Sequence, residues 1–173
     1  MTSIIKVNTI QDVGGNNLLI SNGSGSITTN NIGGQNTPAF LAKKSSNQTV
    51  ASATTTFITW DNEVYDTNSA FGTNRFTVPS GHAGKYMIYC TIDLTGESAN
   101  HYSMNEIFVN NSLTQYNIQR FSGTGEVSNN IVVSLDLSVG DFVTIKMLHN
   151  TGSDETIDHD KLTWFGGYKL IGA

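Results

Sequence analysis

Residues 130–148 read NIVVSLDLSVGDFVTIKML and show most clearly how this chain folds. In the first part of this stretch apolar and polar residues alternate, so the odd-numbered residues from Ile131 to Leu137 share one apolar face. Such alternation is typical of a half-buried β-strand. A Gly140-Asp141 turn follows, and then a second run rich in β-branched and aromatic residues. The stretch therefore predicts two strands joined by a turn.

The same kind of pattern continues through the chain from Thr37 onward. β-Branched and aromatic residues alternate with polar ones, and Gly, Asn, Asp or Pro stand between the runs. No segment longer than a turn or two has helical periodicity. The expected strands are residues 38–43, 54–60, 75–78, 85–94, 104–109, 114–121, 126–137, 142–148 and 161–171. This density of strands predicts an all-β sandwich or jelly roll.

The composition is that of a folded, weakly charged protein. Of its 173 residues 13% are charged and 38% are hydrophobic, and the formal net charge is -5. The nine basic residues are scattered along the sequence, which argues against a nucleic acid as partner. No apolar run approaches the roughly 20 residues of a membrane span, and the N-terminus lacks a signal-peptide layout. We therefore expect a soluble protein without membrane insertion.

Two of the expected strands, residues 85–94 and 142–148, are apolar on both faces. In so small a domain, such strands suggest that another subunit covers one sheet.

The first 36 residues differ from the rest of the chain. They hold short apolar segments, around Val7 and at Leu18-Leu19-Ile20, separated by Gly- and Asn-rich turn signals. Such segments cannot bury enough surface to offset their conformational entropy. We therefore expect residues 1–36 to be a docking arm and linker, and residues 37–173 to be the globular domain. The residues expected to dock are Ile5, Val7 and Ile10.

Four stretches of the expected domain occur in a characteristic order. They are Pro38-Ala39-Phe40-Leu41-Ala42, the strand ending at Pro79 with Gly84-Lys85-Tyr86 after it, residues 134–143, and residues 163–170. Together they resemble the globular domain of the C1q and tumour-necrosis-factor-like family. The resemblance implies a jelly-roll sandwich.

The resemblance also implies an assembly. Members of this family are compact homotrimers that pack aromatic residues of the closing strand around the three-fold axis. Trp164, Phe165 and Tyr168 occupy the matching strand here and have enough apolar area to be buried in this way. The alternative is a monomeric sandwich that buries these aromatic residues internally.

The arm resembles a different group of proteins. It reads Ile5-Lys6-Val7-Asn8-Thr9-Ile10-Gln11-Asp12, followed by Gly15-Asn16-Asn17-Leu18-Leu19. This is similar to the leader of structural proteins of tailed bacteriophages, particularly those of aquatic and cyanobacterial hosts. The resemblance implies that the arm attaches to capsid or tail proteins, or starts trimerisation. Assembly in a reducing bacterial cytoplasm would suit a chain with one cysteine.

No recognisable catalytic motif accompanies these features. The histidines His82, His101, His149 and His159 have no partner at a spacing that makes a known site, and Cys90 lies in an apolar run where a buried structural thiol is expected. Nothing resembles a Gly-x-Ser-x-Gly elbow, a phosphate-binding loop or paired cysteines. The expectation is a protein that is not an enzyme.

Residues 154–160 form the densest acidic cluster, expected in a solvated loop. Because some C1q-like domains bind calcium, Asp154, Asp158 and Asp160 are candidate calcium ligands, and no other cofactor is expected.

Aromatic residues in loops could bind a host surface glycan by packing against a sugar ring. The candidates for glycan contact are Tyr65, Phe71, His101, Tyr102 and Tyr116. For each of them we favour the alternative, a place in the core or in an interface.

These expectations point to a structural protein on the virion surface. It would be a homotrimeric knob that serves as capsid decoration or as a tail-fibre module for host attachment. A free carbohydrate-binding lectin of C1q type is the alternative, and a surface glycan hydrolase is a third, less favoured one.

Overall fold

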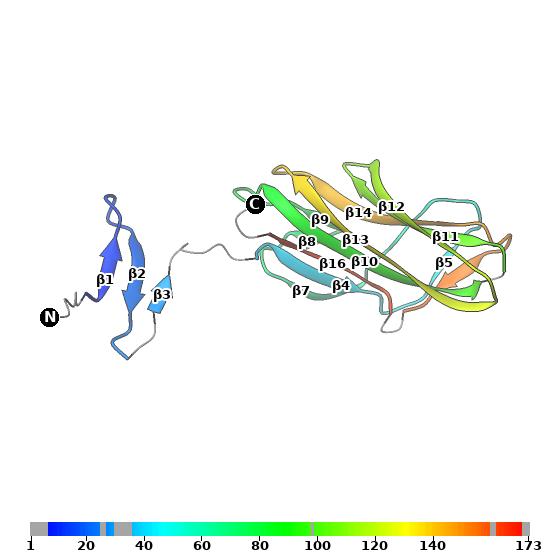
Figure 1. Ribbon diagram of the computed structural model, residues 1–173, viewed down its shortest axis with the longest axis horizontal. Helices are drawn as coiled ribbons and strands as arrows, with labels where there is room; N and C mark the ends of the chain where they lie inside the picture. Colours follow the sequence, from blue (N-terminus) through cyan, green and yellow to red (C-terminus); the bar gives the residue numbers. More distant parts are fainter. Residues whose placement is uncertain (1–6, 25–26, 30–35, 98, 160–161, 171–173) are drawn as a thin grey trace. The chain divides into compact units, whose positions relative to one another are not determined.

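The computed structural model describes residues 7–24, 27–29, 36–97, 99–159 and 162–170. These residues form sixteen strands and no helix, so they also contain no helix long and apolar enough to cross a membrane. The chain divides between Gln35 and Asn36 into two compact units (Figure 1). The expectation of an all-β protein is confirmed.

The N-terminal unit is a three-stranded antiparallel sheet. β1 (Thr9–Gln11) pairs with β2 (Asn17–Ser21), which pairs with β3 (Ile27–Thr29). The Asp12 carboxylate holds the turn between β1 and β2 by accepting hydrogen bonds from the backbone amides of Gly14 and Asn16. None of residues 7–24 is buried.

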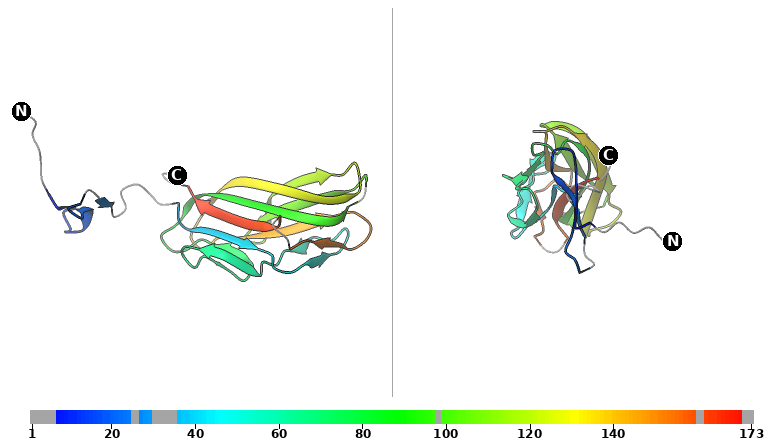
Figure 2. Two further views of the ribbon diagram at one scale, coloured as in Figure 1. Left: turned by 90° about the horizontal axis from the view of Figure 1, so that it is seen from below. Right: turned by 90° about the vertical axis from the view of Figure 1, so that its left-hand side faces the viewer.

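The larger unit is a sandwich of two antiparallel sheets. The seven-stranded sheet has the order β5-β15-β10-β16-β4-β7, with β13 on the free side of β10. Its strands are β4 (Ala39–Lys43), β5 (Gln48–Val50), β7 (Asn62–Asp66), β10 (Gly84–Glu97), β13 (Gly125–Leu137), β15 (Glu155–Ile157) and β16 (Trp164–Lys169). Figure 2 (left) shows β13, β10, β16 and β4 side by side in one layer.

The six-stranded sheet has the order β12-β11-β14-β9-β8, and β6 also pairs with β14. Its strands are β6 (Thr56–Phe57), β8 (Phe71–Gly72), β9 (Arg75–Thr77), β11 (Tyr102–Val109), β12 (Ser112–Arg120) and β14 (Phe142–His149). β12 lies at the edge of this sheet, and all nine of its residues are exposed.

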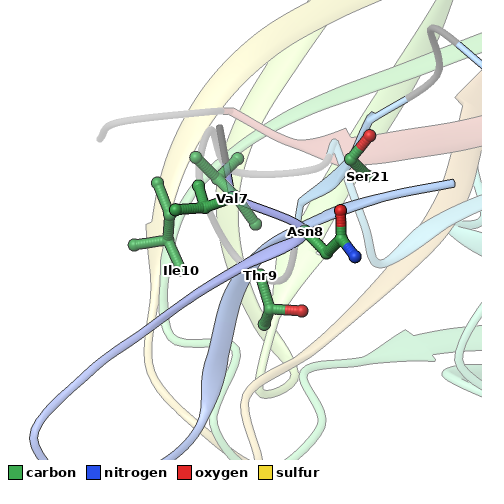
Figure 3. A pocket seen from close by; sticks show the side chains of 6 residues that line it. Val7, Asn8, Thr9, Ile10 and Ser21 are labelled. Atoms are coloured by element: carbon green, nitrogen blue, oxygen red, sulfur yellow. The ribbon is translucent and has the colours of Figure 1, made fainter. Parts of the chain in front are cut away.

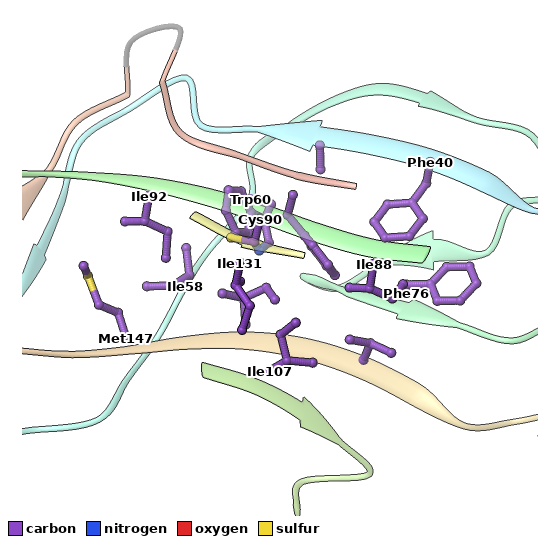
Figure 4. Packing of buried hydrophobic residues seen from close by; sticks show 14 of the residues in the cluster. Phe40, Ile58, Trp60, Phe76, Ile88, Cys90, Ile92, Ile107, Ile131 and Met147 are labelled. Atoms are coloured by element: carbon purple, nitrogen blue, oxygen red, sulfur yellow. The ribbon is translucent and has the colours of Figure 1, made fainter. Parts of the chain in front are cut away.

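The core lies between the two sheets and is aromatic at one end (Figure 4). The ring of Phe40 stacks on Phe76 at 4.8 Å and meets Phe165 edge-on at 4.9 Å. Aromatic pairs of this geometry add to the free energy gained by burial. Alternation along β10 supplies inward residues such as Ile88, and Ile107 faces them from β11.

Buried asparagines connect the two sheets beside this core. The Asn105 Nδ2 atom donates to the backbone oxygen of Asn129 at 2.7 Å, and Asn117 Nδ2 donates to Asn129 Oδ1 at 3.0 Å. Asn129, which lies on β13, is 1% exposed, so its amide depends on partners in the protein.

Replacing Asn129 with alanine removes the hydrogen bonds that its amide donates to the backbone oxygens of Ser103 and Asn117. Because Asn129 and Ser103 are buried, water does not replace these bonds, and we expect the free energy of unfolding to fall by about 2 kcal/mol. Urea unfolding followed by circular dichroism measures this change. Ser138→Ala, exposed just after the same strand, is the control and should change the value by less than about 0.5 kcal/mol.

Several strands were not predicted from the sequence. β5, β7, β8 and β15 are two to five residues long, too short to display alternation. β15 falls within the acidic stretch that we expected to be a solvated loop. That expectation is wrong for residues 155–157, because Glu155 and Ile157 are buried.

Candidate functional site

The face of the seven-stranded sheet turned away from the core is apolar at its centre. Strand register places Val132, Tyr89, Gly166, Leu41 and Tyr65 in one row across β13, β10, β16, β4 and β7. The side chain of Val132 is 64% exposed and that of Tyr65 is 43% exposed. We call this surface the outer apolar face and define it by Leu41, Tyr65, Met87, Tyr89, Val132, Trp164 and Tyr168.

Gly166 allows the aromatic residues of this face to pack closely. A Cβ atom at Gly166 would lie 2.4 Å from the Tyr89 ring, so the ring rests directly on the backbone of β16. There it meets Trp164 edge-on at 5.3 Å and lies 6.3 Å from the ring of Tyr168. An open hollow of about 400 Å³ lies beside these rings, lined by Leu41, Lys43, Tyr89 and Trp164.

The hydroxyl of Tyr89 on this face is uncharged at physiological pH. Burial raises the pKa of Tyr89 far above its usual value, and a hydrogen bond with Tyr65 raises it further. A neutral, partly desolvated phenol suits a surface that packs against protein.

No family model matches the sequence, and no curated protein matches it. Among solved structures, murine APRIL matches with a TM-score of 0.58 and 14% identity, over 76% of this chain and 98% of that chain. The globular domain of zebrafish complement 1qA matches with a TM-score of 0.55 and 16% identity, over 77% of this chain and 97% of that chain. Eiger TNF from S. frugiperda matches with a TM-score of 0.54 and 16% identity, over 78% of this chain and 93% of that chain.

The fold is the C1q/TNF-like jelly roll. At these identities the likeness concerns the fold. It confirms the architecture implied by the order of the four stretches between Pro38 and Leu170. We refer below to the larger unit as the C1q/TNF-like domain.

The C1q/TNF-like domain does not place the three predicted interface residues on one surface. Trp164 and Tyr168 lie on the outer apolar face and are half-buried. Phe165 is fully buried in the core, where it meets Phe40 and Trp60. The prediction that Phe165 lies in an interface is wrong, because neighbouring residues of a strand point to opposite faces and Trp164 takes the outer one.

The N-terminal unit brings two of the predicted docking residues together. Val7 and Ile10 line a hollow of about 120 Å³ with Leu19, and Figure 3 shows the side chains of Val7 and Ile10 next to each other. Val7 is 52% exposed and Ile10 is 44% exposed. The third predicted docking residue, Ile5, lies outside the described residues.

The five candidates for glycan contact do not form one site. Phe71 stacks on Phe40 at 5.2 Å and packs against the core, which is the alternative favoured for it from the sequence and not a position for glycan contact. Tyr65 belongs to the outer apolar face, and the Nδ1 atom of His101 is buried. Tyr102 and Tyr116 lie on the outer face of the six-stranded sheet, and Tyr116 is 56% exposed.

A group of carboxylates in the C1q/TNF-like domain could hold a metal ion. Oxygen atoms of Asp93, Glu126 and Asp158 lie within 4.8 Å of one another, and such oxygens are the ligands that calcium prefers. Of the residues predicted from the sequence, Asp158 belongs to this group, Asp154 does not, and Asp160 lies outside the described residues. Asp93 and Glu126 were missed because they come from β10 and β13, far from Asp158 in the sequence.

The thiol of Cys90 and the imidazole of His149, two groups that take part in catalysis in many enzymes, are both buried inside the domain. Cys90 is buried, and this burial raises the pKa of its thiol well above the usual value, so the reactive thiolate is scarce at neutral pH. The prediction of a buried structural thiol is confirmed. His149 is also buried, and its ring nitrogens bond to the backbone oxygen of Val50 and to Thr151 Oγ1.

Proposed function

We propose that the chain is a non-enzymatic structural component of a phage virion. In this proposal three C1q/TNF-like domains form a knob on the virion surface, as capsid decoration or as a tail-fibre module for host attachment. The N-terminal unit attaches the knob to capsid or tail proteins. The observation that carries the proposal is the outer apolar face, which a single chain leaves partly open to water.

The outer apolar face supports the trimer. It is a contiguous surface of large apolar side chains, and surfaces of this kind on soluble proteins mark interaction sites. The family that the sequence resembles forms compact homotrimers. In a three-fold assembly, each subunit can cover this face of its neighbour.

The N-terminal unit supports docking to a second protein. A sheet of three short strands needs an apolar face packed against something else to be stable, and none of residues 7–24 is buried within the unit. Val7 and Ile10 present apolar surface there. The resemblance of this segment to phage leaders makes a virion protein the proposed partner.

Removing residues 1–36 tests this role. We expect the shortened chain to keep a folded, trimeric C1q/TNF-like domain and to lose incorporation into particles. The paired substitution Val7→Asp and Ile10→Asp in the full chain should lower the copy number per particle at least about tenfold, because two carboxylates would enter an apolar contact. Quantitative mass spectrometry of purified particles measures the copy number.

Ser24→Asp, at an exposed position of the same unit, is the matched control and should incorporate normally. Normal incorporation of the shortened chain would contradict the docking role.

A free carbohydrate-binding lectin of C1q type is the second candidate. Tyr116 favours it, since its ring is 56% exposed on the outer face of the six-stranded sheet. Glycan binding by the free protein without any association with particles would support this alternative over the virion role.

A further inference from the structure

The two sheets of the C1q/TNF-like domain differ in charge. The strands of the seven-stranded sheet carry three basic and seven acidic residues. The basic ones are Lys43, Lys85 and Lys169, and the acidic ones are Glu63, Asp66, Asp93, Glu97, Glu126, Asp136 and Glu155. The strands of the six-stranded sheet carry Arg75, Arg120 and Lys146 and one acidic residue, Glu106. The six-stranded sheet is thus the basic side of an acidic protein.

The three basic groups lie on the outer face of the six-stranded sheet, each above an aromatic ring. The guanidinium of Arg75 lies 4.8 Å from the ring centre of Phe142, and that of Arg120 lies 5.8 Å from the ring centre of Tyr102. The Lys146 Nζ atom lies 4.0 Å from the ring centre of Phe108. Contacts of this kind hold a cation over the ring face and limit the freedom of its side chain.

Among the described residues none of these cations forms an ion pair within 4.0 Å. Glu106 stands opposite Lys146 in the strand register but is 4% exposed. Burial raises the pKa of its carboxyl group, and a hydrogen bond with Thr55 and the charge of Lys146 oppose that rise. The charges of Arg75 and Arg120 are therefore available to an external anion, whereas that of Lys146 is shared with Glu106.

The cations are spread over the face on three different strands. Arg75 lies on β9, Lys146 on β14, and Arg120 on β12 at the edge of the sheet. Between them the face presents apolar side chains of Met104, Ile118 and Leu148.

We propose that this face binds an acidic polysaccharide. Carboxylates of the polymer pair with Arg75, Lys146 and Arg120, and the exposed ring of Tyr116 packs against a sugar. The proposal deepens the host-attachment role and rests on it for its biological context, although binding to the face needs neither the virion nor the arm.

The small number of cations favours this ligand over a nucleic acid. A duplex carries one charge per about 1.7 Å of its axis, so three cations on the whole face would leave most of the phosphates above it without a partner. A polysaccharide can place neutral sugar rings over the apolar and aromatic side chains of the face instead. An acidic peptide is the competing ligand, and the experiment includes it.

Binding of the full chain to immobilised polygalacturonate tests the proposal, with three further surfaces in parallel. These are fully methyl-esterified polygalacturonate, poly-glutamate and single-stranded DNA. We expect binding to polygalacturonate that weakens as salt rises, and affinity at least about tenfold lower for the uncharged ester and for the other two polyanions.

Two paired variants locate the binding site. Arg75→Gln with Arg120→Gln should weaken binding to polygalacturonate about tenfold, since two exposed charge pairs are lost. Lys85→Gln with Lys169→Gln removes the same charge from the other sheet and should leave binding unchanged. Tyr116→Ala should weaken binding without reducing its salt dependence.

Equal loss in both paired variants would show attraction by net charge alone and would overturn the proposal. Equal binding to poly-glutamate through the same arginines would overturn it in favour of an acidic protein partner. Light scattering on the same samples reports the assembly separately, so a monomeric mass would contradict the trimer and leave the result for this face standing.

Discussion

Val132→Asp converts the assembled protein into folded single chains. Val132 is 64% exposed in the isolated domain, so the substitution leaves the core untouched. In the proposed trimer each new carboxylate would be buried without a partner, at a cost of about 3–5 kcal/mol per site. We expect the mass from light scattering at micromolar concentration to fall from three chains to one, 18.7 kDa. Circular dichroism should still show the β-sheet signal.

Val139→Asp is the matched control for this result. Val139 is 52% exposed and lies in the turn between β13 and β14, away from the outer apolar face. It should remain trimeric. A wild-type chain with the mass of a monomer, or a trimeric Val132→Asp variant, would rule out the outer apolar face as the assembly surface.

Phe165→Ala lowers the free energy of unfolding by about 3–5 kcal/mol, because it removes a large side chain from a filled core. Its neighbour Trp164 lies on the opposite face of β16, so Trp164→Ala should cost only about 1 kcal/mol in an isolated chain. Both values are measured by urea unfolding of the monomeric Val132→Asp variant, which separates folding from assembly.

In the wild-type background we expect Trp164→Ala to weaken the trimer more than Phe165→Ala does, although Phe165→Ala costs more folding free energy. The reason is that Trp164→Ala removes apolar area from the outer apolar face, where the subunits would meet, whereas Phe165 lies in the core. A Phe165→Ala variant with unchanged stability and weakened assembly would contradict the position of Phe165 in the core.

The sequence predicted the β-architecture because its strongest signal is local. Alternation from Ile131 to Leu137 appears on β13 as inward residues, and the turn at Gly140-Asp141 separates β13 from β14. β8, with two residues, carries no periodicity and could not be recognised.

The candidate sites were harder to predict because they combine residues from separate strands. Asp158 was recognised within an acidic run, whereas Asp93 and Glu126 stand alone in the sequence and meet it only in the folded chain. Arg75 and Arg120 are far apart in the sequence, yet both lie on one sheet face.

Local order along the chain was therefore sufficient for the longer strands and the class of fold. The faces to which Phe165 and Trp164 turn, and the alignment of Lys146 with the two arginines, followed from the pairing of the strands. The physical reason is register: a strand's side chains alternate with a period of two, so a shift of one residue moves every side chain to the other face. That register is set by packing between segments far apart in the sequence.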